Sequence, residues 1–234
     1  MPKTAYKHLF FDLDHTLWDF ERNSNETLAE LYQEFGLRQL GVSSSDAFQK
    51  HFHLVNAELW QLYDTNQITQ SDLRQRRFRQ VLQQLACQTE GDCDAWNDWY
   101  LAHCPKKPHL MPGAFELLEY LAPRYKMHII TNGFDEVQGV KLSSSGITDF
   151  FREVVTSQRA GARKPQAKMF QYAFEAAGCQ PEEALMIGDN PETDIAGALG
   201  VGMHAAYFRP EQSLYPACEA TYQIKELKEL KNWL

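Results

Sequence analysis

Residues 9–17 read Leu-Phe-Phe-Asp-Leu-Asp-His-Thr-Leu and set two carboxylates, Asp12 and Asp14, directly after a short apolar run. The run is typical of a buried strand that ends at the carboxylates. If the strand stays regular, alternation points both carboxylates to the same side. Like charges this close repel each other unless a cation or a proton lies between them. The pair therefore predicts a divalent-metal site, a shared-proton acid/base site or both. The simpler alternative is a solvated loop with two acids.

Composition narrows the class of protein. The chain has 234 residues, 44% of them hydrophobic, which fits one large domain or a core with an inserted domain. The formal net charge of -8 argues against general nucleic-acid binding, because phosphates would be repelled overall, but it leaves room for a small phosphorylated ligand. No apolar run approaches the roughly 18 residues of a membrane-spanning helix, and residues 1–11 lack the apolar region of a secretory signal.

The cysteines are odd in number and scattered, so neither a disulfide framework nor a zinc site is expected. They are Cys87, Cys93, Cys104, Cys179 and Cys218. Free thiols in a reducing cytoplasm are the simpler interpretation. We therefore expect a cytoplasmic protein without a membrane partner, either a monomer or a homodimer.

Two sections of the chain differ in their hydrophobic pattern. Residues 21–103 show helical spacing throughout, with Gly36 as a helix stop and Thr69-x-x-Asp72 as a capping box. This section predicts a small helical bundle. From Met111 onward, short apolar strands alternate with helices, and Pro165 is placed in the first turn of a helix that Gly178 ends. The predicted strands are 127–131, 153–156, 184–187 and 204–208.

Alternating strands and helices predict an α/β fold, a Rossmann-like doubly wound parallel sheet covered on both faces. The strand that precedes Asp12 belongs with this section by type. The helical bundle is therefore an insertion after the first strand. The predicted domains are 1–17 with 108–234 for the α/β core and 18–107 for the helical cap.

Polar residues follow the first strand and the strands 127–131, 153–156 and 184–187, and ligands of open parallel sheets bind beyond the carboxyl ends of the strands. Carboxylates suit Mg²⁺, whereas a hydroxyl, an amide and backbone N–H groups can hold phosphate oxygens. A lysine supplies positive charge for a phosphoryl group. The residues in question are Asp12, Asp14, Thr131, Asn132, Gly133, Lys164, Asp189 and Asp194.

Each motif also has an ordinary interpretation. Thr131-Asn132-Gly133 alone is a turn signal, Lys164-Pro165 a solvated lysine before a helix, and Asp194 an exposed helical acid. Gly188-Asp189 alone is a helix entry with an N-terminal acid. The joint occurrence of complementary groups at four strand ends, in chain order, favours a functional site.

The four motifs resemble those of the haloacid dehalogenase (HAD) superfamily. They are Asp12-Leu13-Asp14-x-Thr16, Thr131-Asn132-Gly133, Lys164-Pro165 and Gly188-Asp189-x-x-x-x-Asp194. The helical segment matches the cap that this superfamily inserts after the first strand. His15 departs from the pattern, because many members carry glycine there. The wider segment from Phe11 to Glu21 resembles the YjjG-type pyrimidine 5′-nucleotidases, which dephosphorylate nucleoside monophosphates.

The resemblance implies a set of roles. Asp12 would be the nucleophile that forms an aspartyl-phosphate, and Asp14 would protonate the leaving oxygen and then activate water. Asp14 would have to be protonated when the substrate arrives. Mg²⁺ would be held by Asp12, by Asp189 and by the backbone carbonyl of Asp14. Thr131, the backbone N–H of Asn132 and Lys164 would bind the phosphoryl oxygens, and Asp194 would hold a metal-bound water or orient Lys164.

Residues of the cap and its entry are less defined. Trp18 and Phe20 follow the catalytic loop, and a packing hinge is favoured over stacking on a base. The arginines between Arg74 and Arg79 predict a solvated helix face rather than a substrate contact. The remaining histidines lack ligand spacing and are interpreted as structural; they are His8, His51, His53, His109 and His128.

Alternative functions remain open. A dehalogenase and a phosphonate hydrolase of this superfamily lack the second acid of the pair, so Asp14 argues against both. A sugar-phosphate mutase keeps both acids. Phosphatases for phosphoglycolate or a small sugar phosphate are the main enzymatic alternative, and a catalytically silent binding module is the alternative outside enzymes.

Overall fold

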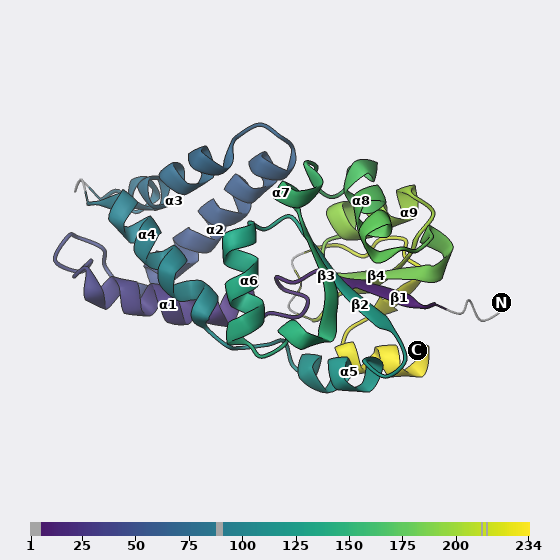
Figure 1. Cartoon of the computed structure of the whole chain (residues 1–234). Helices are drawn as coiled ribbons and strands as arrows, with labels where there is room; N and C mark the ends of the chain where they lie inside the picture. The colour runs from purple at the N-terminus through teal and green to yellow at the C-terminus, as the bar shows by residue number, and fades with distance from the viewer. Residues whose placement is uncertain (1–5, 88–90, 212, 214) are drawn as a thin grey trace. The chain divides into compact units, whose positions relative to one another are not determined.

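The computed structural model describes residues 6–87, 91–211, 213 and 215–234. The chain divides into two compact units, which are shown in Figure 1 and described separately. One unit comprises Met1–Phe20 and Pro108–Leu234, and the other comprises Glu21–Lys107. The expected boundary at residue 17 therefore lies three residues before the one in the structure, which groups Trp18–Phe20 with the α/β unit.

The α/β unit is built on a six-stranded parallel sheet with the order β3-β2-β1-β4-β5-β6. The strands are β1 (His8–Phe11), β2 (Lys126–Thr131), β3 (Phe151–Thr156), β4 (Ala184–Gly188), β5 (His204–Phe208) and β6 (Tyr222–Ile224). Residues of β1 and β4 are buried throughout, because both are central strands with both faces covered. The doubly wound α/β fold predicted from the sequence is confirmed, with β6 as an additional short edge strand.

Helices cover both faces of this sheet. They are α5 (Ala114–Leu121), α6 (Asp135–Ser144), α7 (Ser157–Ala160), α8 (Ala167–Ala177) and α9 (Gly197–Gly200). Figure 1 shows α7, α8 and α9 on one side of the sheet and α5, with the C-terminal turns, on the other. On the first side, Phe10, Met186 and Phe170 belong to one buried apolar cluster. This packing fixes the strand ends from which the polar residues project.

Two details of this unit differ from the sequence-based expectation. Pro165 lies in a turn, and α8 begins at Ala167 after the extended residue Gln166. Helix α6 was not predicted, because its buried side chains are mainly polar: Gln138, Lys141 and Leu142. A helix that buries polar residues has no apolar stripe for a periodicity argument to detect.

The second unit is a helical bundle of α1 (Phe20–Glu34), α2 (Ser45–Asp64), α3 (Gln70–Gln84) and α4 (Cys93–His103). The first residue of α1, Phe20, lies on the boundary of the units. Thr69 and Asp72 form the predicted capping box at the start of α3. The interior of the bundle is aromatic, and Phe78 contacts the rings of Phe48, Phe52 and Tyr100.

One expectation about this bundle is wrong. Arg77 is buried rather than solvated, with its guanidinium 5.8 Å from the ring centroid of Phe52 and 5.6 Å from that of Tyr100. Its position four residues after Leu73 places it on the inner face of α3. Arg76 and Arg79 are exposed, as the pattern predicts.

In the part of the chain that the structure describes, no helix combines the length and the apolar character needed to span a bilayer. All five cysteines are among the described residues and keep their thiols.

Candidate active site

The order of the strands locates a binding edge. The chain leaves β1 toward β2 on one side and returns to β4 on the other, so the strand order reverses between β1 and β4. Ligands of doubly wound folds bind at such a switch point, beyond the carboxyl ends of the strands. Asp12 directly follows β1 and Asp189 directly follows β4. The fold therefore brings two carboxylates to the position where a ligand is expected.

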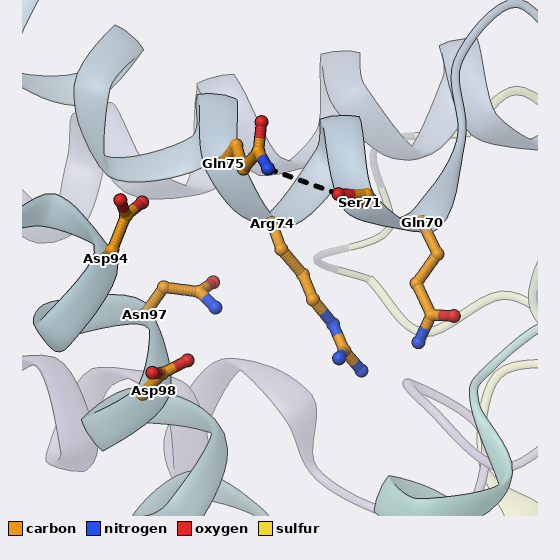
Figure 2. A pocket seen from close by; sticks show the side chains of 7 residues that line it. All are labelled: Gln70, Ser71, Arg74, Gln75, Asp94, Asn97 and Asp98. Carbon is orange, nitrogen blue, oxygen red and sulfur yellow. Dashed lines mark hydrogen bonds between the residues drawn. The ribbon is translucent and has the colours of Figure 1, made fainter.

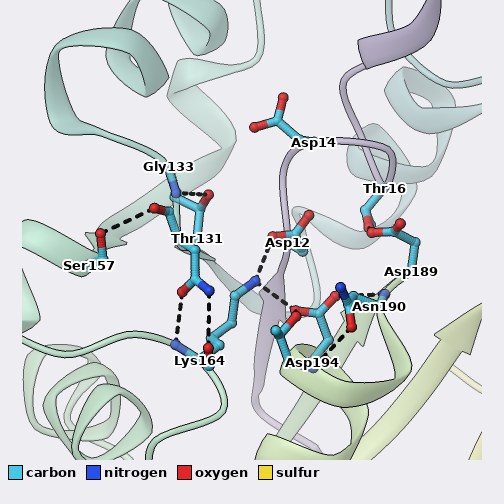
Figure 3. Close-up of polar contacts among 12 residues, drawn as sticks. Asp12, Asp14, Thr16, Thr131, Gly133, Ser157, Lys164, Asp189, Asn190 and Asp194 are labelled. Atoms are coloured by element: carbon cyan, nitrogen blue, oxygen red, sulfur yellow. Dashed lines mark hydrogen bonds and ion pairs between the residues drawn. The ribbon is translucent and has the colours of Figure 1, made fainter. Parts of the chain in front are cut away.

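Lys164 is the centre of the charge arrangement at this edge (Figure 3). Its Nζ lies 2.6 Å from Oδ1 of Asp12 and 2.7 Å from Oδ1 of Asp194, and its side chain is 2% exposed. Burial alone would lower the pKa of Lys164, but the two carboxylates outweigh it and raise the pKa above its ordinary value. Lys164 therefore stays protonated, as an ammonium group, inside the protein.

One ammonium group does not balance the acids around it. Carboxylate oxygens of Asp12, Asp189 and Asp194 lie within 4.8 Å of one another. Burial raises the pKa of Asp12 well above its usual range, against the opposing effect of Lys164, and Asp194 and Asp189 add to the rise. Burial and the charge of Asp194 raise the pKa of Asp189 to about 8. Excess negative charge in a set of hard oxygen donors fits a divalent cation.

Asp194 and Asp189 are held by further hydrogen bonds. The backbone N–H of Asn190 donates to Oδ2 of Asp194 (3.0 Å), and the hydroxyl of Thr16 donates to Oδ1 of Asp189 (3.1 Å). A Cβ on Gly188 would come within 2.2 Å of Oδ2 of Asp194, so only glycine allows this approach. The glycine before Asp189 therefore has a packing role in the motif.

Asp14 lies apart from the three clustered acids. Strand β1 stops at Phe11, so the regular strand that would point Asp12 and Asp14 to the same side does not continue through them. Figure 3 shows the Asp14 carboxylate directed away from Asp12 and Lys164. It accepts hydrogen bonds from Nζ of Lys141 (2.6 and 2.8 Å) and from Nε2 of Gln138 (3.0 Å).

These contacts determine the charge of Asp14. Burial raises the pKa of Asp14, but the charge and hydrogen bonds of Lys141, together with the hydrogen bond from Gln138, outweigh burial and lower the pKa below its ordinary value. Asp14 is therefore a carboxylate in the substrate-free protein. The expected protonated form needs a further negative charge nearby, such as that of a phosphate.

Two residues of the Thr131-Asn132-Gly133 motif, at the end of β2, form hydrogen bonds within the protein. The side chain of Asn132 donates to the backbone carbonyl of Lys164 (3.0 Å) and accepts from its N–H (2.8 Å). The N–H of Gly133 donates to Oγ1 of Thr131 (3.0 Å). Of the phosphate-binding groups expected here, the Asn132 amide and the Gly133 N–H thus already have intramolecular partners.

The loop after Asp14 has a constrained backbone. His15 has φ of 63°, a left-handed conformation that glycine adopts without strain, which accounts for the glycine common at this position in the family it resembles. Trp18 is fully buried, and Nζ of Lys141 lies over its ring, 4.6 Å from the ring centroid. Phe20 is half-buried and contacts the rings of His15 and Trp18. These contacts favour packing over base stacking for Trp18.

Gln138 and Lys141 were not found from the sequence. Both lie on α6, which was not predicted, and they contact Asp14 over separations of 124 and 127 residues. Their spacing of three residues on one helix face was a local signal. Nothing in the local sequence links that face to Asp14.

The helical unit has a hollow of its own. It measures about 320 Å³ and is open to solvent between α3 and α4 (Figure 2). Its lining is polar and consists of Gln70, Ser71, Arg74, Gln75, Asp94, Asn97 and Asp98. Asp94 is already paired with Arg79, at 2.8 Å. The hollow shares no residue with the motifs at the strand ends.

Comparison with known proteins places the chain in the family that its motifs resemble. The family model of haloacid dehalogenase-like hydrolases matches residues 9–208. The chain belongs to this family. It is therefore a hydrolase of the HAD type, and the motifs that resemble this superfamily lie in the matched segment.

Relatives of this HAD hydrolase include named nucleotidases. The chain is 31% identical to pyrimidine 5′-nucleotidase YjjG of Escherichia coli, over 97% of this chain and 96% of that protein. It is 29% identical to pyrimidine 5′-nucleotidase PynA of Streptococcus pneumoniae, over 98% and 95% of the two chains. The crystal structure of the HAD-hydrolase YfnB from Bacillus subtilis, bound to magnesium, is similar with a TM-score of 0.86 at 27% identity, covering 97% of this chain and 98% of that one.

Proposed function

We propose that this HAD hydrolase is a Mg²⁺-dependent phosphomonoesterase that acts through an aspartyl-phosphate on Asp12, with pyrimidine nucleoside 5′-monophosphates as substrates. The observation that carries the proposal is the group of buried Asp12, Lys164 and Asp194 with half-buried Asp189 at the switch point of the sheet. It combines a nucleophilic carboxylate, a fixed ammonium group and further oxygen donors in one place.

The residues at this edge fit a magnesium ion. Asp12 and Asp189 would hold it through carboxylate oxygens, and Asp14 through its backbone carbonyl. The acids outnumber Lys164, and burial, with the charge of the neighbouring acids, raises the pKa values of Asp12 and Asp189. When bound, the ion would supply positive charge to the phosphoryl oxygens and relieve repulsion between the acids.

The reaction follows from the positions of the acids. A carboxylate oxygen of Asp12 attacks phosphorus, and the bond from phosphorus to the nucleoside oxygen breaks while Asp14 gives that oxygen its proton. Water then attacks the aspartyl-phosphate and gives a proton to Asp14, which releases phosphate and restores the Asp12 carboxylate. Asp14 takes up its proton as the phosphate dianion arrives, because a nearby negative charge favours the protonated carboxyl group. Lys164 and Thr131 bind the transferring oxygens.

The substrate class rests on similarity. The full-length relatives from Escherichia coli and Streptococcus pneumoniae are named pyrimidine 5′-nucleotidases. The second acid, Asp14, separates the site from dehalogenases and phosphonate hydrolases, which lack it. Phosphate release from a small phosphorylated substrate is therefore favoured over carbon–halogen cleavage.

A phosphate-release screen tests this function. We expect hydrolysis of UMP, dUMP and dTMP with Mg²⁺ and its loss in EDTA. A protein that prefers sugar phosphates or phosphoglycolate would contradict the nucleotidase assignment and leave the phosphatase class standing. Absence of hydrolysis of every phosphomonoester, including p-nitrophenyl phosphate, would contradict the phosphatase class and favour a binding module.

The nucleophile is tested by Asp12→Asn. This variant should lose on the order of 10⁴-fold or more in turnover, because the amide is a poor nucleophile. Its circular dichroism spectrum should match that of the parent protein. Glu192→Gln, in an exposed position of the π-helical turn Pro191–Ala196 after β4, is the control and should keep full activity. Mg²⁺-dependent hydrolysis by folded Asp12→Asn would exclude Asp12 as the nucleophile.

A further inference from the structure

Gln138 connects two groups of the proposed reaction. Its side-chain Nε2 donates to Oγ1 of Thr131 (2.7 Å) and to Oδ2 of Asp14 (3.0 Å), and the residue is fully buried. The direction of this amide is fixed, because a carboxylate can only accept hydrogen bonds. The Nε2 group must therefore face Asp14, and the same nitrogen faces the Thr131 hydroxyl.

This arrangement determines what the Thr131 hydroxyl can do. Its oxygen accepts from Nε2 of Gln138 and also from the N–H of Gly133 (3.0 Å), so both lone pairs are occupied. Within the described residues, no acceptor is recorded for the hydroxyl hydrogen. The hydroxyl is thus left as a donor, which is the role that a phosphoryl oxygen needs.

A close approach supports the position of Gln138. A Cβ built on Gly133 would lie 2.1 Å from Nε2 of Gln138 and 2.5 Å from its side-chain carbonyl carbon. Real side chains do not tolerate such distances, so Gly133 is required for Gln138 to reach Thr131. The glycine that ends the Thr131-Asn132-Gly133 motif thus serves the amide of α6.

Lys141 completes the contact one helical turn further along α6. Its ammonium group binds both oxygens of Asp14, at 2.6 and 2.8 Å, and lies over the Trp18 ring. The side chain of Lys141 is 8% exposed, and the fully buried ring below it leaves little freedom of movement. Asp14 is therefore fixed at both oxygens, outside the group formed by Asp12, Asp189 and Asp194.

We propose that Gln138 and Lys141 are positioning residues of the phosphatase reaction. Lys141 holds the Asp14 carboxyl group out of the cation cluster and in reach of the leaving oxygen. Gln138 keeps the Thr131 hydroxyl directed as a donor to the phosphoryl group. This inference rests on the proposed function. It assigns Gln138 and Lys141 a role in the reaction that they exert only through Asp14 and Thr131.

The leaving group of the substrate tests the part played by Lys141. p-Nitrophenolate departs without much protonation, whereas the oxygen of a nucleoside needs the proton of Asp14. Lys141→Met should lower kcat/KM about 100-fold with UMP and less than about 5-fold with p-nitrophenyl phosphate, because kcat/KM reports the transfer to Asp12 and excludes the later hydrolysis that both substrates share. Lys141→Arg, which can bind both oxygens of Asp14, should restore most of the kcat/KM with UMP.

Two further variants separate this role from a structural one. In an Asp14→Asn background, Lys141→Met should have little additional effect, because residues that act as a unit are not additive. Val140→Ala, at a 37% exposed position of the same helix, is the matched control and should leave both substrates unchanged. Equal losses on the two substrates, or additive losses with Asp14→Asn, would overturn the role of Lys141.

The part played by Gln138 has a different signature. Gln138→Met should raise KM for UMP and for p-nitrophenyl phosphate alike, and weaken inhibition by inorganic phosphate about 10-fold, because the Thr131 hydroxyl loses its fixed orientation. Unchanged phosphate inhibition would overturn this role. If the parent protein hydrolyses no phosphomonoester, the proposed function fails. If it does and the leaving-group pattern is absent, this inference alone fails.

Discussion

Two regions of the α/β unit bury ionisable side chains in different ways, one as ion pairs and the other as neutral imidazoles. Beyond the carboxyl ends of β1 and β4, the ammonium group of Lys164 pairs with the carboxyl groups of Asp12 and Asp194. Nearer the beginning of β1 and within β2, His8 and His128 stack at 5.2 Å between ring centroids, and their pKa values are lowered, chiefly by burial. The sheet thus contains a charged region and a neutral one.

The difference separates function from packing. Burying charges costs free energy that apolar residues would not cost, so a buried group with excess negative charge indicates a role beyond stability. The two imidazoles share one hydrogen bond, 3.1 Å between Nδ1 of His8 and Nε2 of His128, and Nδ1 of His128 is buried without a hydrogen-bond partner. The interpretation of His8 and His128 as structural agrees with these contacts. Each prediction below alters one of the two regions and leaves the other intact.

The largest effect is expected from Lys164→Met. Removal of the ammonium group leaves two buried carboxyl groups, those of Asp12 and Asp194, without their partner and should lower the free energy of unfolding in EDTA by about 3–5 kcal/mol. Urea denaturation at neutral pH measures this. Lys168→Met, which removes an exposed lysine whose Nζ contacts a backbone carbonyl, is the control and should change little. Equal effects of the two substitutions would show that the charged region is not tightly paired.

Mg²⁺ should raise the free energy of unfolding of the protein by binding in the charged region. At about 100 times its dissociation constant, a ligand that binds only the folded state adds about 2.7 kcal/mol to the free energy of unfolding. Thermal unfolding with Mg²⁺ and with EDTA measures the gain. Asp189→Asn should lose most of it, and Glu192→Gln, four residues after the end of β4, should keep it. A gain that survives in Asp189→Asn would place the cation elsewhere.

The neutral region should respond to acid. Burial lowers the pKa of His128 to about 4 in the folded protein, whereas a histidine in the unfolded chain has a pKa near 6.5. Between these two pH values the unfolded state therefore binds more protons than the folded state. Stability due to this group is present above pH 6.5 and is lost as the pH falls toward 4, by on the order of 2 kcal/mol.

His128→Phe should therefore flatten the acid dependence of the urea midpoint over this window. Phenylalanine keeps the stacking surface against Phe10, whose ring centroid lies 4.7 Å from that of His128. His109→Phe, at a half-buried position of the same unit, should leave the dependence unchanged. An unaltered slope in His128→Phe would contradict the assignment of a buried neutral imidazole.

The charged region could be predicted largely from the sequence. Asp12 and Asp189 directly follow apolar strands, and Lys164 and Asp194 lie in the segments that come after β3 and β4, so the parallel sheet carries them to one edge. The separation of Asp14 from Asp12 could not be predicted, because it depends on where β1 stops and on side chains from α6. Helix α6 and Arg77 were both missed for one reason: polar side chains occupy inward positions, so the hydrophobic pattern is misleading there.

The most direct test of the central claim is rapid-quench trapping with a radiolabelled nucleoside monophosphate and Mg²⁺. Acid quenching within the first turnover should yield protein-bound phosphate that hydroxylamine removes, as expected for an acyl phosphate, and peptide mapping should place the label on Asp12. Phosphate release without any protein-bound label through the first turnover would contradict the account, because water would then attack the substrate directly.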